Sequence, residues 1–206
     1  MARLLLVRHG STALQVAGRY CGHTDVPLST EGLRQAECLR ERLSDEGIAA
    51  AYSSDLCRAI ATASIIVERR NMTVTPVAKL REINFGLFEG RTFREIEADD
   101  PDAARFWSAD RGGPAFPEGE SIAALVARVE TVMAKLKGHA PDDTVLVVAH
   151  KGPLSVLICL LLGMDPLEWW RLSFDCGSLS LIETYANSAV IRLLNDVCHL
   201  EPRTGR

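Results

Sequence analysis

The chain has 206 residues, of which 47% are apolar and 24% charged, and its formal net charge is −4. These values are typical of a folded protein and exclude a largely disordered chain, and the length predicts a single domain over residues 1–206. The acidic balance argues against nucleic acid or an anionic membrane as a partner, because both attract basic surfaces.

The first predicted strand covers Leu4–Val7, four apolar residues followed at once by Arg8, His9 and a glycine. Such a run is typical of a strand buried on both faces, as in a parallel sheet. The carboxyl ends of parallel strands are where open α/β sheets bind ligands. Arg8 beside His9 therefore predicts a place where a cation holds an anion against a nucleophilic ring nitrogen. The alternative is a strand that ends in two polar residues facing solvent.

Two helices and a strand are predicted next. Ser29 is a good N-cap for the first helix, and a strand over 48–52 leads through a polar turn into the second helix. Residues 74–77 are a further candidate strand. The stripe expected to be buried comprises Leu33, Ala36, Leu39 and Leu43 in the first helix and Leu56, Ala59, Ile60, Ala63 and Val67 in the second.

The second half of the chain continues this alternation and ends in a hairpin. Ser121 caps a long helix through Leu136, and residues 144–149 form a strand apolar enough to be central. A helix over 152–162 follows, with Gly163 as its C-terminal stop. Strands over 178–184 and 190–194 are predicted to form a hairpin that closes the sheet.

Residues 84–120 interrupt this regular pattern. Periodicity gives way there to glycine, proline, aspartate and aromatic residues, and we expect a partly helical insertion that forms a lid over the site. The alternative is a second small hydrophobic cluster under a long connection. The aromatic residues concerned are Phe85, Phe88, Phe93, Phe106, Trp107 and Phe116.

Six cysteines are spread along the chain without a CxxC pair, and no secretory leader precedes the first strand. We therefore expect a reduced, cytoplasmic protein, in which Cys38 and Cys159 are small core residues of helices. The longest apolar run, 156–162, is too short to span a bilayer. No Cys/His cluster and no pair of histidines at ligand spacing appears, so the sequence predicts no metal site.

Polar residues recur where the predicted strands end: Arg8 and His9, the segment 53–58, and His150. Together with their neighbours they resemble the histidine phosphatase superfamily, which contains cofactor-dependent phosphoglycerate mutases and many small phosphomonoesterases. The resemblance implies a phosphoglycerate mutase-like α/β fold, a three-layer α/β/α sandwich with a mostly parallel central sheet. The matching segments are LVRHGST (6–12), GHTDVPLSTEG (22–32), SSDLCRA (53–59), LREINFGLFEG (80–90) and VAH (148–150).

The resemblance also implies catalytic roles. His9 matches the nucleophile, which takes the phosphoryl group on a ring nitrogen, and Arg8 and Arg58 match the arginines that bind phosphate. His150 matches a second histidine that donates a hydrogen bond to the phosphoryl oxygens. Glu82 matches the general acid, a role that requires a raised pKa. No metal or other cofactor is implied, and without the resemblance Arg58 and Glu82 would be assigned to the solvated surface.

Further substrate contacts are expected around these residues. Two positions depart from the family pattern: Gln15 stands where asparagine is common, and Lys151 follows His150 directly. Gln15 retains an amide that can donate to phosphate, while Lys151 adds positive charge at the rim. The backbone groups expected to contact substrate belong to Ser11, Thr12, Cys21 and Gly22.

Supporting roles are expected for the remaining motif residues and histidines. His23 is expected to shape a turn or the substrate entrance, and Glu89 to be structural rather than catalytic. His139 and His199 match no motif and are expected on the surface.

Three functions are compatible with this pattern. The first is a phosphomonoesterase that hydrolyses a small phosphorylated metabolite. The second is a cofactor-dependent phosphoglycerate mutase, but segment 90–120 carries four arginines against eight acidic residues, which disfavours a doubly phosphorylated ligand. The third is a non-catalytic module that binds a phosphorylated ligand, which would need neither His9 nor Glu82.

A finer resemblance concerns the substrate. Segments 18–28 and 194–200 are similar to those of α-ribazole phosphatases, which remove a phosphate during assembly of the lower ligand of cobalamin. α-Ribazole phosphate is therefore one candidate substrate. The sequence leaves the oligomeric state open, with a homodimer as one candidate.

Overall fold

The computed structural model of the protein describes residues 2–102, 104–105, 116–186 and 188–201. Part of the expected lid, with Phe106 and Trp107, lies outside these ranges. None of the helices in the described ranges is long and apolar enough to span a membrane.

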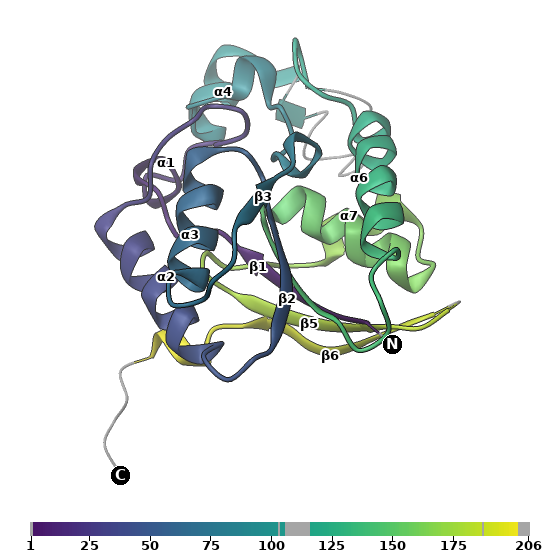
Figure 1. Ribbon diagram of the computed structural model, residues 1–206. Coiled ribbons are helices and arrows are strands. Elements are labelled where there is room, and N and C mark those ends of the chain that lie inside the picture. The colour runs from purple at the N-terminus through teal and green to yellow at the C-terminus, as the bar shows by residue number, and fades with distance from the viewer. Residues whose placement is uncertain (1, 103, 106–115, 187, 202–206) are drawn as a thin grey trace.

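A six-stranded sheet forms the centre of the molecule, in the order β3-β2-β4-β1-β5-β6 (Figure 1). The first four strands of that order pair in parallel, whereas β5 runs antiparallel to β1, and β6 antiparallel to β5. The expected mostly parallel sheet with a closing hairpin is confirmed. The strands are β1 (Ala2–Arg8), β2 (Ile48–Ser53), β3 (Val74–Pro76), β4 (Thr144–Ala149), β5 (Leu179–Thr184) and β6 (Ala189–Asp196).

Helices cover both faces of the sheet, which confirms the three-layer sandwich (Figure 1). Alternate residues of β1 serve the two faces: Leu4 and Leu6 pack in one core with α6 and α7, and Leu5 and Val7 in the other with α2 and α3. The helices are α1 (Ala13–Val16), α2 (Thr30–Arg42), α3 (Cys57–Val67), α4 (Phe93–Asp99), α6 (Ile122–Leu136) and α7 (Lys151–Leu162). Short 3-10 helices are η1 (Ala78–Leu80), η2 (Gly86–Phe88), η3 (Pro166–Arg171) and η4 (Cys198–Leu200).

The helix ends follow the predicted capping residues. The hydroxyl of Ser29 accepts a hydrogen bond from the Gly32 N–H, and that of Ser121 does the same for Ala124 at the start of α6. Gly163 ends α7 with φ +68°, in the left-handed region that glycine adopts without strain. These local signals therefore fix where α2, α6 and α7 begin or end.

The predicted buried stripe of α2 is wrong at Leu33, which is 45% exposed. The helix turns Gly32 and Gln35 inward instead, because a Cβ at Gly32 would lie 2.2 Å from the Ser11 carbonyl oxygen. The Gln35 side chain also accepts the Ser11 N–H at 2.8 Å. The same rotation leaves Cys38 half-buried rather than in the core, while Cys159 is buried as predicted.

The described part of the insertion contains the short helices η2 and α4 together with an aromatic cluster. The rings of Phe85 and Phe116 meet edge to face at 4.9 Å, and Tyr20 lies 5.0 Å from Phe85. Phe88 and Phe116 belong to the larger of the two cores. The insertion is thus partly helical as expected, and these aromatic residues pack as a hydrophobic cluster.

Candidate active site

The end of β1 places His9 in the interior of the molecule, where its side chain is 1% exposed. Nδ1 of the ring lies 2.7 Å from the Gly10 carbonyl oxygen. A carbonyl oxygen only accepts hydrogen bonds, so Nδ1 carries the proton and Nε2 presents its lone pair. The local turn after β1 therefore selects which nitrogen of His9 is available for chemistry.

Three side chains surround that Nε2 atom, two of them from distant parts of the chain. Nε of Arg58 lies 3.3 Å away and Nε2 of Gln15 3.4 Å away, and both can donate a hydrogen bond to it. The ring of His150 stands edge-on to that of His9, with 4.7 Å between the centroids. The predicted convergence of Arg58, His150 and His9 at one edge of the sheet is confirmed.

Arg58 stands in the first turn of α3 and is fully buried. Its guanidinium donates to the carbonyl oxygens of Gly22 at 2.6 Å and Thr24 at 2.9 Å, with a longer contact to Cys21 at 3.4 Å. These bonds leave the Nε–H edge directed at His9. Arg58 is therefore held rigidly by one loop and aimed at the ring.

The loop that holds Arg58 is itself held by Glu89, at the end of η2. The Glu89 carboxylate accepts hydrogen bonds from the N–H groups of Gly22, His23 and Thr24, and from the Thr24 hydroxyl. Burial alone would raise the pKa of Glu89, but these donors and the Phe85 N–H together hold that pKa below its usual value. Glu89 orders the loop whose carbonyl groups then orient Arg58.

Glu82 follows η1 and is buried against the start of α7. Its Oε1 atom accepts the N–H groups of Ile83 and Gly152, each at 3.0 Å. Gly152 permits this approach, because a Cβ there would lie 2.4 Å from Oε1. Burial raises the pKa of Glu82, against the lowering effect of these two N–H groups and of Arg8 and Arg58. The raised pKa predicted for a general acid is thus present in this carboxyl group.

The two buried histidines are neutral for related reasons. The pKa of His9 is lowered well below its usual value by burial and by the positive charges of Arg58 and Arg8, although the Gly10 carbonyl raises it. Burial likewise lowers the pKa of His150, as do His9 and the two arginines. Both ring nitrogens of His150 and Nε of Arg8 are buried without a hydrogen-bond partner among the described residues. These atoms are free to bind a ligand.

The other residues expected at the substrate lie beside this cluster, but their backbone groups bond within the protein. The Thr12 N–H donates to the Gln15 side chain at 3.1 Å, and the Ser11 N–H donates to the Gln35 side chain. The carbonyl groups of Cys21 and Gly22 accept from Arg58. Their contacts with substrate stay predictions. Lys151 is half-buried as the first residue of α7, beside His150.

Two histidines expected on the surface are half-buried instead. Nε2 of His139 lies 3.0 Å from the Tyr52 hydroxyl, within hydrogen-bond distance, and Nδ1 lies 3.4 Å from a carboxylate oxygen of Asp143. Nε2 of His199 donates to the Gly177 carbonyl oxygen at 2.9 Å. Sequence reasoning did not foresee this burial, because Tyr52 lies 87 residues from His139 and Gly177 lies 22 residues from His199.

Sequence reasoning also missed a Cys/His cluster. Asp196, Cys198 and His199 bring one carboxylate, one thiol and one imidazole together after β6. These residues lie where β6 runs into η4, whereas the histidine pairs sought in the sequence were one helix turn apart. The expectation that no such cluster exists is therefore corrected.

Comparison with known proteins gives a consistent result. The family model described as histidine phosphatase superfamily (branch 1) matches residues 4–197. Phosphoserine phosphatase 1 of Hydrogenobacter thermophilus is 34% identical over 200 residues, which cover 97% of this chain and 95% of the relative. The adenosylcobalamin/alpha-ribazole phosphatase of Escherichia coli is 34% identical over 193 residues, covering 94% and 95%. The crystal structure of the alpha-ribazole phosphatase from Shigella flexneri matches with a TM-score of 0.87 at 35% identity, covering 94% of this chain and 96% of that one.

Proposed function

The chain belongs to the histidine phosphatase superfamily (branch 1), and from this membership we propose that it hydrolyses a small phosphorylated metabolite through a phosphohistidine formed on His9. The observation that carries the proposal is the orientation of that ring. Its Nδ1 proton is bound to Gly10, and its Nε2 lone pair faces Arg58 and His150. A neutral imidazole held in this way is a competent nucleophile toward phosphorus.

In the first step, Nε2 of His9 forms a bond to phosphorus while the ester P–O bond breaks. Glu82 gives its proton to the departing alkoxide, so that an alcohol leaves. Arg8, Arg58 and His150 donate hydrogen bonds to the phosphoryl oxygens and offset their charge. The neutral state of His9 at physiological pH supplies the lone pair that the step consumes.

In the second step, water attacks the phosphohistidine. The Glu82 carboxylate, now ionised, takes a proton from the water as the new O–P bond forms. The N–P bond breaks, and its electron pair returns to Nε2 of His9. Inorganic phosphate leaves, and both His9 and Glu82 regain their starting protonation states.

Replacement of His9 tests the covalent route directly. We expect His9→Ala to abolish turnover and to abolish an acid-labile, alkali-stable phosphoenzyme that rapid quenching traps from labelled substrate. His139→Ala is the matched control, because His139 lies at the amino-terminal end of β4, away from the site, and both signals should persist. Substantial turnover by folded His9→Ala, or no trapped phosphoenzyme in the unaltered protein, would contradict the proposal.

For the substrate, we propose the phosphate ester of α-ribazole. Segments 18–28 and 194–200 support it, as do the relatives from E. coli and Shigella flexneri that carry this name. A panel of α-ribazole phosphate, phosphoserine and 3-phosphoglycerate, compared by kcat/KM, tests the choice. A clear preference for phosphoserine would make phosphoserine the substrate instead. If phosphoglycerate isomerisation is faster than hydrolysis, the protein is a mutase. Tight binding without turnover would show that the protein is a non-catalytic binding module.

A further inference from the structure

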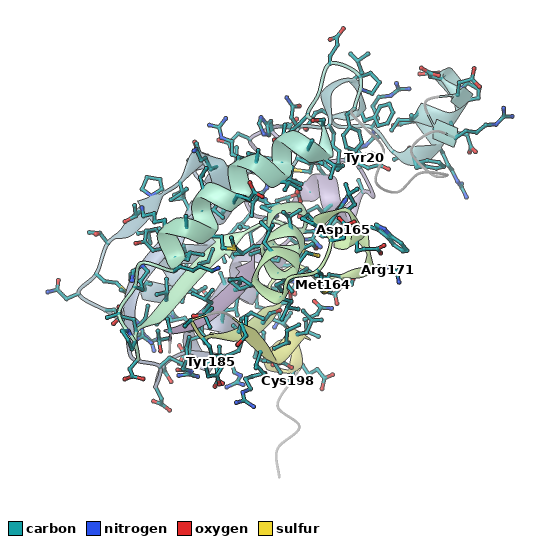
Figure 2. All side chains as sticks on the ribbon, turned by 90° about the vertical axis from the view of Figure 1, so that its right-hand side faces the viewer. Tyr20, Met164, Asp165, Arg171, Tyr185 and Cys198 are labelled. Carbon is teal, nitrogen blue, oxygen red and sulfur yellow. The ribbon has the colours of Figure 1, made fainter. Side chains whose placement is uncertain are left out.

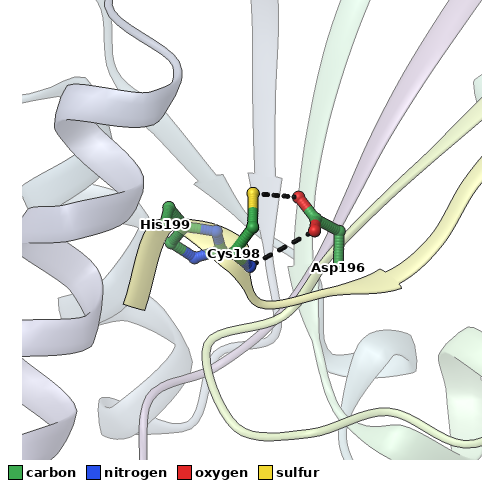
Figure 3. A group of neighbouring side chains, drawn as sticks. All are labelled: Asp196, Cys198 and His199. Atoms are coloured by element: carbon green, nitrogen blue, oxygen red, sulfur yellow. Dashed lines mark hydrogen bonds between the residues drawn. The ribbon is translucent and has the colours of Figure 1, made fainter. Parts of the chain in front are cut away.

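A second cluster of functional groups lies where β6 runs into η4. Asp196, Cys198 and His199 each offer one ligand atom, and these atoms lie within 4.8 Å of one another (Figure 3). Carboxylate, thiolate and imidazole are the donor types that zinc takes in proteins. We propose that these three residues form a zinc-binding site that is separate from the catalytic centre.

His199 is already oriented for this role. Its Nε2–H donates to the Gly177 carbonyl oxygen at 2.9 Å, so Nδ1 carries the lone pair. Nδ1 is buried and has no hydrogen-bond partner among the described residues. Zinc-bound histidines typically donate their other ring N–H to a carbonyl or carboxylate, which fixes the ring. Gly177 supplies that outer contact before any metal arrives.

Asp196 and Cys198 have the separation that a metal requires. The Cys198 sulfur lies 3.2 Å from Oδ2 of Asp196, and Oδ1 of the same carboxylate accepts the Cys198 N–H. Two ligands on a tetrahedral zinc, with bonds of about 2.3 Å to sulfur and about 2.0 Å to oxygen, lie about 3.5 Å apart. Zinc would replace the thiol proton that this pair shares, and binding would release that proton to solvent.

The charges around the cluster permit a divalent cation. A thiolate and the Asp196 carboxylate supply two negative charges, which balance the charge of zinc. Arg42 at the end of α2 is a nearby positive group that opposes binding, but it is exposed, so water screens its charge. Cys198 is also exposed, which leaves room for water as a fourth ligand.

The cluster is connected to the end of β1 through the backbone of Gly177. Gly177 accepts from His199, and its own N–H contacts the carbonyl oxygens of Arg8 and His9, each at 3.1 Å. Cys198 and Tyr20, which packs on the insertion, lie well apart (Figure 2). We therefore expect zinc to stabilise the segment around η4 without taking part in hydrolysis.

Metal binding to the full-length protein tests the site. After treatment with EDTA and removal of the chelator, Zn²⁺ is titrated against a competing chromophoric chelator, and Co²⁺ is used as an optical probe. We expect one ion per chain and a thiolate-to-cobalt charge-transfer band. Cys198→Ser should lose the band and weaken Zn²⁺ binding at least about tenfold. Cys38→Ser removes a half-buried thiol outside the cluster and should change neither result.

The catalytic histidines are the competing location for a metal, and His9→Ala separates the two. Binding that persists in His9→Ala and weakens in Cys198→Ser supports the site. Unchanged affinity in Cys198→Ser, or loss of the charge-transfer band in His9→Ala, would overturn it. EDTA should lower the Tm of the zinc-loaded protein while kcat/KM stays constant, and a fall in kcat/KM that zinc restores would contradict the separation from catalysis.

Discussion

The parallel and antiparallel halves of the sheet both end in polar clusters, but of opposite kinds. At the parallel half, His9, Arg58 and His150 come from positions far apart in the sequence and are almost completely buried. At the antiparallel half, Asp196, Cys198 and His199 fall within four residues, and the cysteine is exposed. The crossover helices of the parallel half bring separate segments to one edge and cover them, whereas a hairpin only places neighbours together.

This difference decides the electrostatics of each cluster. Burial lowers the pKa of His9 and raises that of Glu82, so it favours the neutral form of both groups, as the proposed nucleophile and proton donor require. The cluster after β6 remains partly in contact with water and keeps groups that can exchange a proton for a metal. Burial therefore distinguishes the proposed phosphoryl-transfer site from the proposed metal site within one sheet.

The largest expected effect tests the acid of the parallel half. Glu82→Gln should lower kcat/KM about 10²- to 10⁴-fold for alkyl phosphates, because glutamine has no acidic proton to give. Activity of the unaltered enzyme should fall as pH rises through the raised pKa of Glu82, and this alkaline limb should vanish in the variant. p-Nitrophenyl phosphate is the control, since its leaving group needs no proton. An equal loss for both substrates would exclude the acid role.

A somewhat smaller loss is expected when the rigid fork of Arg58 is replaced. Arg58→Lys keeps the charge, but one ammonium group cannot bond Gly22, Thr24 and phosphate together. We expect kcat/KM to fall about 10²- to 10³-fold. Arg34→Lys, on the exposed face of α2, should leave kcat/KM unchanged. Full activity of Arg58→Lys would show that charge alone suffices.

Substitution of one leucine in each half compares the packing of the parallel and antiparallel halves of the sheet. Leu146 of β4 is fully buried, whereas Leu194 of β6 is 39% exposed. Leu146→Ala should lower the free energy of unfolding by about 2–5 kcal/mol. Leu194→Ala should change it by about 0.5 kcal/mol or less. Urea unfolding monitored by circular dichroism measures both, and equal losses would show that the antiparallel edge is covered in solution.

The smallest effect concerns residues 22–24, the loop that holds Arg58. Glu89→Gln should cost about 1–3 kcal/mol of folding free energy, because the amide replaces a carboxylate that accepts from three successive N–H groups. The folded-state pKa of Glu89 is depressed, so its contribution is complete above the ordinary glutamate pKa of about 4.3 and is lost as pH falls through the lower folded value. The gap between the two proteins should therefore close in acid. A gap independent of pH would exclude a role for the charge.

Prediction from sequence succeeded where the signal is local. Apolar runs located β1 and β4, and capping residues located α2, α6 and α7. The short helix α1 was not predicted, although the sequence carries a signal for it. Thr12 and Gln15 form a capping box of the recognisable T-x-x-Q type. The convergence of His9, Arg58 and His150 was predictable because each follows or adjoins a parallel strand.

Prediction was incomplete or wrong where a long-range contact decided the outcome. A structural role was predicted for Glu89, but the loop that it orders lies 65 to 67 residues away, and no local pattern reports such a pairing. Leu33 fits the apolar stripe of α2, yet the close approach of Gly32 to Ser11 turns it outward. Both cases depend on backbone proximity across the fold, which hydrophobic periodicity does not encode.

The absence of a side chain at Gly152 means that a single substitution during evolution could remove the proposed catalytic activity. Because an alanine methyl group would lie 2.4 Å from Oε1 of Glu82, one substitution would displace the proposed proton donor and leave His9 and both arginines unaltered. Under the proposed mechanism, a duplicated copy carrying that change is expected to bind phosphate esters but to hydrolyse them slowly.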